Sequence, residues 1–123
     1  MVEKITIDEI TKLKSLWQKS DVRKKLEKYH DDVEGAFNGW CKVWLSDDFR
    51  KWNIEDSVSK IKVPLLAIQG TNDQYGTIKH IDIIEKNIKT NFSKVIISNC
   101  KHSPHHEYPE LVLDKTAHFL LNN

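Results

Sequence analysis

The chain has 123 residues, 39% of them hydrophobic, and its 19 basic and 18 acidic side chains leave a net charge of +1. This length and composition fit one domain with a core of its own, and the balance of charge argues against a nucleic-acid partner, which needs concentrated basic side chains. No apolar run approaches the ~20 residues of a membrane span, the N-terminus lacks a signal-peptide segment, and two isolated cysteines suggest neither disulfides nor a metal cofactor, so we expect a cytoplasmic protein without membrane contact.

The first half of the chain predicts helices. Thr6 and Glu9 have the spacing of a capping box just before an apolar helical stripe. Ser20 is a candidate N-cap for a second helix, and Asp31 is a candidate start for a third. The sequence therefore predicts a helical segment over residues 1–61.

The third predicted helix carries large side chains at helical spacing. Four of them fall on one side: Val33, Phe37, Trp40 and Trp44. Aromatic residues in this pattern usually belong to a core, and the alternative is a wall of a substrate pocket. Gly35 and Gly39 weaken this helix, and close packing of another element would explain them.

The second half, residues 62–123, alternates strands and helices. Apolar runs at residues 63–69 and 94–98 predict strands buried in a parallel sheet. A helix over residues 77–89 connects them, and a last helix begins near Pro109. Its expected sheet-facing side is Val112, Leu113, Thr116, Ala117 and Leu120. The predicted fold class is α/β, with a helical half followed by a β-α-β-α unit, the two together forming one compact unit.

Each predicted strand ends in a polar turn that carries a side chain suited to proton transfer. Asp73 follows the first strand and His102 follows the second. In parallel sheets, functional residues sit just past the carboxyl ends of strands, and an acid followed by a histidine forms two members of a hydrolytic triad. The alternatives are an Asx-turn role for Asp73 and a backbone-bonded loop role for His102. None of the eight serines lies in a Gly-x-Ser-x-Gly sequence.

These turns make the chain, from about Tyr29 to its end, similar to the C-terminal part of an α/β-hydrolase-fold protein. The matching segments are residues 69–77 (Gln-Gly-x-x-Asp-x-Tyr-Gly-Thr), residues 100–105 (Cys-x-His-Ser-Pro-His), and upstream Trp40, Trp44 and residues 49–56. They resemble the end of the cap region and the last β-α-β-α unit of the core. In that family, the preceding strands bring the oxyanion hole and the nucleophile.

The resemblance implies a function. Asp73 and His102 would be catalytic residues for hydrolysis of a small, partly apolar substrate, an ester or a C–C, epoxide or C–halogen compound. Trp40, Trp44 and Tyr75 would be substrate-binding residues. Whether the chain is itself an enzyme stays open, and we expect it to be inactive alone because it lacks a nucleophile elbow and an oxyanion hole.

Other chemistry around the histidine loop is less favoured. His102, His105, His106 and Glu107 invite a metal site, but Pro104 and the start of a helix should make these side chains diverge. A replacement nucleophile could be Ser103, Cys41 or Cys100. Ser103 adjoins the histidine and should point away from it, and single cysteines are usually small buried hydrophobes.

A two-stranded sheet is marginal by itself, and the first strand has an open edge. We therefore expect a partner, either a second copy in a homodimer or a complementary N-terminal hydrolase half. The alternative function is a non-catalytic, self-associating remnant or interaction module of the same family. The origin of the chain stays open: it is an excised piece of a longer enzyme, a natural truncated product or a remnant.

Overall fold

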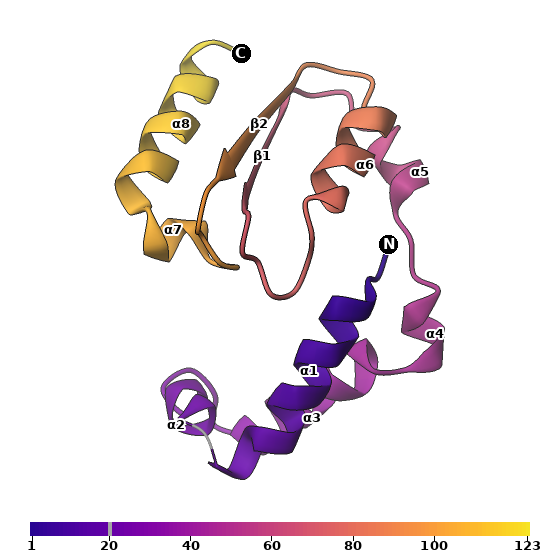
Figure 1. The fold of residues 1–123 in the computed structure, drawn as a ribbon, viewed down its shortest axis with the longest axis vertical. Coiled ribbons are helices and arrows are strands. Elements are labelled where there is room, and N and C mark those ends of the chain that lie inside the picture. Colours follow the sequence, from indigo (N-terminus) through magenta and orange to yellow (C-terminus); the bar gives the residue numbers. More distant parts are fainter. Residues whose placement is uncertain (20) are drawn as a thin grey trace. The chain divides into compact units, whose positions relative to one another are not determined.

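The computed structural model describes residues 1–19 and 21–123, and it divides the chain into two compact units. One unit comprises residues 2–52, and the other comprises residues 53–123 together with Met1 (Figure 1). The short helix α5 (Glu55–Val58) contacts α6 (Lys79–Asn87), so it belongs to the second unit, whereas the sequence placed the border after residue 61. That the two units form one compact unit stays a prediction. The fold class is α/β, as predicted.

The helical unit is built on two packed helices. Its elements are α1 (Lys4–Leu16), the 3-10 turn η1 (Trp17–Lys19), α2 (Val22–Leu26), α3 (Val33–Trp44) and α4 (Asp47–Arg50). Helices α1 and α3 pack together, and Ile10, Trp17, Phe37 and Cys41 are buried in this unit. The rings of Trp17 and Phe37 stack with centroids 3.7 Å apart and planes within 4°. Aromatic stacking therefore forms the centre of this core.

The helix starts differ from the predictions. Helix α1 begins at Lys4, because the backbone ladder continues upstream until the N–H of Ile7 donates to the carbonyl of Glu3. Thr6 therefore lies inside the helix and is buried, and the predicted capping box was wrong. The predicted cap at Ser20 lies outside the described residues. Helix α3 is capped by Asp32, one residue after the predicted Asp31.

Neither glycine of α3 is accounted for by close packing of a second element. The backbone N–H of Gly35 donates to the Asp32 carboxylate at 2.8 Å, and a Cβ there would lie 2.1 Å from an oxygen of that carboxylate. Gly35 is therefore part of the cap. A Cβ on Gly39 would meet nothing within 4 Å. The buried stripe of the helix is Val33, Phe37 and Cys41, while Trp40 is 38% exposed.

The second unit contains the sheet. Strands β1 (Leu65–Gly70) and β2 (Phe92–Ile97) are parallel, with Leu65 opposite Phe92 and Gly70 opposite Ile97. Helix α6 connects them, and α7 (Pro104–Glu107) and α8 (Pro109–Leu121) follow β2. In Figure 1, α6 and α8 flank the two strands. Ile81 and Ile97 are buried in this unit. The β-α-β-α order agrees with the prediction.

Helix α8 buries only part of its predicted sheet-facing side. Leu113 and Leu120 are 71% and 70% exposed, whereas Val112, Thr116 and Phe119 are half-buried. The half-buried residues follow a seven-residue helical repeat that forms a narrow stripe. Two strands offer too little surface to bury the wider stripe that the sequence suggested. None of the described helices is long and apolar enough to cross a membrane.

Candidate catalytic dyad

The loops after β1 and β2 are joined by backbone hydrogen bonds. The N–H of Thr71 donates to the carbonyl of Ile97 at 2.9 Å, and the N–H of Asn72 donates to the carbonyl of Cys100 at 2.8 Å. In return, the N–H of Asn99 donates to the Thr71 hydroxyl at 2.9 Å. The parallel register places both strand ends at the same edge, and these bonds hold the two loops together there.

Two residues adopt positions that permit this close approach. A Cβ on Gly70 would lie 2.1 Å from the carbonyl oxygen of Cys100, so only glycine fits where β1 ends. Asn99 has a φ of 59°, in the left-handed region that asparagine tolerates better than most residues. The chain can therefore turn sharply after β2 and run back beside the first loop.

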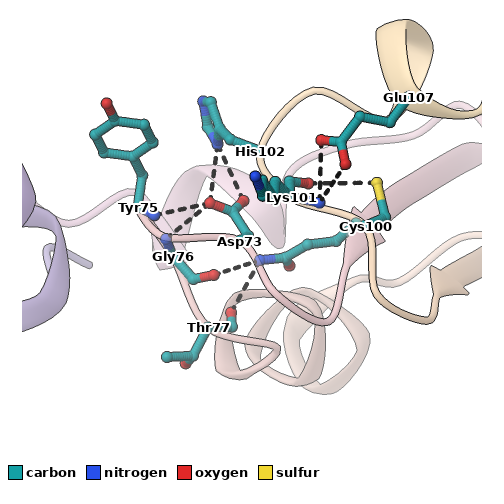
Figure 2. Close-up of polar contacts among 9 residues, drawn as sticks. Asp73, Tyr75, Gly76, Thr77, Cys100, Lys101, His102 and Glu107 are labelled. Carbon is teal, nitrogen blue, oxygen red and sulfur yellow. Dashed lines mark hydrogen bonds and ion pairs between the residues drawn. The ribbon is translucent and has the colours of Figure 1, made fainter.

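Asp73 and His102 meet across these loops, as the sequence predicted. The Nδ1 atom of His102 lies 3.0 Å from each carboxylate oxygen of Asp73 (Figure 2). A carboxylate only accepts hydrogen bonds, so Nδ1 carries the proton and the lone pair of the neutral ring lies on Nε2. The Asp73 side chain is 10% exposed, whereas that of His102 is 54% exposed. The acid is therefore sheltered, and the imidazole is open to a reacting group.

Asp73 also organises its own loop. Its Oδ1 atom accepts hydrogen bonds from the backbone N–H of Tyr75 at 2.8 Å and of Gly76 at 3.3 Å (Figure 2). The Asx-turn role and the histidine-partner role, posed as alternatives from the sequence, thus coexist in one side chain. The ring of Tyr75 meets the ring of His102 edge-on, with centroids 4.9 Å apart. Tyr75 therefore lies within the site.

Two supporting side chains were missed by the sequence analysis. Gln69 is 8% exposed, and its Nε2 donates to the carbonyls of Gly76 at 2.8 Å and of Thr77 at 3.2 Å. The carboxylate of Glu107 accepts the N–H of Lys101 at 3.1 and 3.2 Å. The available signal for Gln69 was an amide within an otherwise apolar strand, because a buried amide must find partners. Each residue supports one of the two loops.

The alternative chemistry finds no support in the described residues. Among them, no group of three or more His, Cys, Asp and Glu side chains could hold a metal ion. Burial raises the pKa of the Cys100 thiol, and the charges of Glu107 and Asp73 raise it further. Burial also raises the pKa of Cys41. Because the thiolate is the nucleophilic form of cysteine, both environments disfavour a nucleophilic role.

The remaining candidates are Ser103 and two tryptophans. Ser103 ends the histidine loop, and its carbonyl accepts the N–H groups of His106 and Glu107 at the start of α7. Trp40 and Trp44 belong to the helical unit, where their rings contact each other with centroids 6.3 Å apart. Their assignment to a substrate site stays a prediction.

Comparison with solved structures shows a similarity to a hydrolase. No protein-family model matches the sequence, and no curated protein matches it. Among solved structures, the chain is similar to a membrane phospholipase A described as a bacterial virulence factor, with 30% sequence identity and a TM-score of 0.58. The match covers 69% of this chain and 26% of the phospholipase chain. The chain thus spans about a quarter of the length of that structural neighbour, and the similarity is compatible with a hydrolase-related origin.

Proposed function

We propose that this chain supplies the acid and the general base of a hydrolytic triad whose nucleophile comes from a polypeptide segment outside these 123 residues. The observation that carries this proposal is the pair of 3.0 Å contacts between His102 Nδ1 and the two oxygens of Asp73. That geometry leaves Nε2 as the base on an exposed ring edge. The acid-before-histidine order along the chain fits the α/β-hydrolase arrangement.

The chemistry follows from the charges and the proton positions. A nucleophilic hydroxyl placed at Nε2 of His102 would lose its proton to the ring, and the ring would return the proton to the leaving group. Asp73 would stabilise the imidazolium formed between these steps, while remaining unprotonated itself. The two N–H groups that donate to Asp73 keep the carboxylate oriented toward the ring. Without a nucleophile and an oxyanion hole, the isolated chain is expected to be inactive.

The substrate class we propose is a carboxylic ester with an apolar portion. Support comes from the similarity to a phospholipase A, an enzyme of ester hydrolysis by its name. Tyr75, whose ring borders that of His102, would contact the substrate directly. Trp40 and Trp44 would contribute apolar surface if the helical unit acts as a cap over the site.

The partner we propose is a complementary N-terminal hydrolase half. Within the described residues, β1 pairs with β2 alone, so its other edge is available for a further parallel strand. A strand added there would place its own carboxyl end beside the loop of Asp73, where a nucleophile is needed. Strand addition would also cover an edge that otherwise invites aggregation.

A second candidate is a non-catalytic module that self-associates as a homodimer. The observation that favours it is the exposed apolar face of α8, where Leu113, Leu120 and Leu121 are 71%, 70% and 85% exposed. A two-fold dimer is the commonest way to cover such a face. Light scattering at micromolar concentration separates the two states, since a stable 14.4 kDa species would exclude the dimer.

The deciding experiment is reconstitution. The chain is mixed with the polypeptide encoded immediately upstream, which should contain Gly-x-Ser-x-Gly, and hydrolysis of a nitrophenyl butyrate ester is followed. We expect turnover only in the mixture, no turnover with His102→Ala, and a loss of ~10³–10⁴-fold with Asp73→Asn.

The matched control is His105→Ala, an exposed histidine outside the dyad that should leave the rate unchanged. Reconstituted turnover that survives His102→Ala would contradict the proposal. Turnover by the chain alone that His102→Ala abolishes would instead reveal a nucleophile within these residues.

A further inference from the structure

The two members of the dyad are held in different ways. The Asp73 side chain is 10% exposed, and two backbone N–H groups of its own loop donate to it. The His102 side chain is 54% exposed, so packing covers less than half of it. The direction of its ring therefore depends on the backbone that carries it. A catalytic pair needs its atoms held within about 0.5 Å of the productive geometry, so this backbone needs support of its own.

One peptide unit lies between the two sides of the dyad. It joins Cys100 to Lys101, directly before the histidine. Its carbonyl oxygen accepts the N–H of Asn72, the residue that precedes Asp73, at 2.8 Å. Its N–H, from Lys101, donates to both carboxylate oxygens of Glu107 at 3.1 and 3.2 Å (Figure 2). The plane of this peptide is therefore fixed from both ends, by the loop of the acid on one side and by α7 on the other.

Glu107 also holds the backbone on the other side of His102. Its own N–H donates to the carbonyl of Ser103 at 3.1 Å, in the first turn of α7. Its side chain thus bonds the residue before the histidine, and its main chain bonds the residue after it. Loss of the side-chain bond would free the backbone before the histidine, while α7 keeps the backbone after it in place.

The contact depends on reach and on an acceptor oxygen more than on charge. Glu107 is exposed, and solvent and salt screen the charge of an exposed carboxylate. The group that it binds is a neutral backbone N–H, which needs an acceptor whether or not that acceptor is charged. A glutamine at this position would offer an amide oxygen with the same reach. An aspartate would keep the charge, but its oxygens would lie one methylene group closer to its own backbone.

We propose that Glu107 is the positioning residue of the dyad. It acts through the N–H of Lys101 to keep the His102 ring against Asp73, and it does so as a hydrogen-bond acceptor and not as a charge. The effect on turnover rests on the proposed hydrolytic function, whereas the effect on the ring is a property of this chain by itself.

Three variants of Glu107 separate these roles in the chain alone. Glu107→Gln keeps the acceptor and the reach, Glu107→Asp keeps the charge but shortens the reach, and Glu107→Ala removes both. The measurement is the side-chain ¹⁵N spectrum of His102 together with the solvent exchange rate of its Nδ1 proton. Glu107→Gln should match the parent chain. Glu107→Asp and Glu107→Ala should both show severalfold faster exchange of this proton and a larger share of rings with the proton on Nε2.

The kinetics of the reconstituted mixture give a second readout. With nitrophenyl butyrate, Glu107→Asp and Glu107→Ala should lower kcat by ~10- to 100-fold with little change in KM, because small misplacements of reacting groups cost this much. Glu107→Gln should keep most of the kcat of the parent. A purely structural role would reduce the amount of folded protein instead, which thermal unfolding of each variant measures.

The matched control is Glu110→Ala, which removes an exposed glutamate in the first turn of α8. It should leave the His102 spectrum and kcat unchanged. A His102 spectrum of Glu107→Ala identical to that of the parent would overturn the proposal. So would a Glu107→Asp variant that behaves like the parent while Glu107→Gln behaves like Glu107→Ala, because charge would then be what matters. Absence of turnover in the parent mixture would remove the hydrolytic function, while the spectra of the chain alone still decide the role of Glu107.

Discussion

The two units hold their side chains in place by different means. In the sheet unit, loops of a few residues follow parallel strands, and backbone bonds such as that from Asn72 to Cys100 fix them. In the helical unit, the contacts are between side chains, through the stack of Trp17 on Phe37 and the bonds of Glu34. The first arrangement holds polar atoms through directional hydrogen bonds, as catalysis requires. The second encloses apolar space.

The contrast is clearest at one glycine from each unit. Gly70 ends β1 with the carbonyl of Cys100 only 2.1 Å from where a Cβ would lie. Gly39 lies on α3 with open space around the same position. Replacing each of these glycines by alanine adds the same methyl group. The two substitutions therefore test whether the backbone is tightly packed at Gly70 and open at Gly39.

Gly70→Ala should have the largest effect. The methyl group would overlap a backbone carbonyl that cannot move without separating the two loops, so we expect a loss of about 3 kcal/mol or more in the free energy of unfolding. This loss in the free energy of unfolding is measured from the amide hydrogen exchange of β1 and β2 at increasing urea concentrations. A loss below about 1 kcal/mol would mean that the loops are not packed as described.

Gln69→Met should come next. It preserves the approximate side-chain volume but removes the donor to the Gly76 carbonyl, at a cost of about 1–3 kcal/mol, while the Thr77 carbonyl keeps its bond from the N–H of His80. The matched change is Asn87→Met, which removes a side-chain bond to the Ile83 carbonyl on α6 and should cost much less. Equal losses in urea unfolding would show that Gln69 has no special role in supporting the Asp73 loop.

Glu34→Gln tests the helical unit through pH. Hydrogen bonds from Trp17, and then from Arg23, hold the pKa of Glu34 below its ordinary value. A carboxyl with a lowered pKa stabilises the fold fully above its unfolded pKa, and this contribution is lost as the pH falls through the lowered value.

The parent chain should therefore be more resistant to unfolding than the Glu34→Gln variant at pH 7, and the difference should shrink in acid. Thermal unfolding across this pH range measures it. Glu9→Gln, at an exposed pair with Lys12, serves as the control with little effect at any pH. A difference between parent and Glu34→Gln that is constant with pH would contradict this account.

Gly39→Ala should have the smallest effect, and it should be stabilising. Alanine favours a helix interior over glycine by about 0.5–1 kcal/mol, and nothing here obstructs the methyl group. The helical unit should gain this amount in urea unfolding. A net loss would mean that another part of the chain contacts Gly39 in solution.

The sequence predicted the proximity of Asp73 and His102 better than it predicted the helix starts. Asp73 and His102 could be placed because each follows a short apolar run, and parallel strands bring such ends together. Gln69 could not be assigned a role, because its partners are backbone carbonyls that any sequence supplies. Thr6 has the chemistry of a helix cap, yet burial and the upstream backbone ladder decided where α1 begins.

The side of α8 that faces the sheet was predicted only in part, for a related reason. The helical pattern selected Leu113 and Leu120, which are exposed, together with Val112 and Thr116, which are half-buried. A periodic pattern shows which faces of a helix could be buried. The width of the sheet surface that the helix packs against decides which residues are in fact buried. With two strands, that width is small.

The most direct test of the proposed dyad is the tautomer of His102, read from its side-chain ¹⁵N chemical shifts where the ring is neutral. Donation to both oxygens of Asp73 predicts a proton on Nδ1 and a lone pair on Nε2. In Asp73→Asn the amide can donate to Nδ1, so the proton should move to Nε2. A parent chain with its proton on Nε2 would contradict the dyad and, with it, the role of His102 as general base.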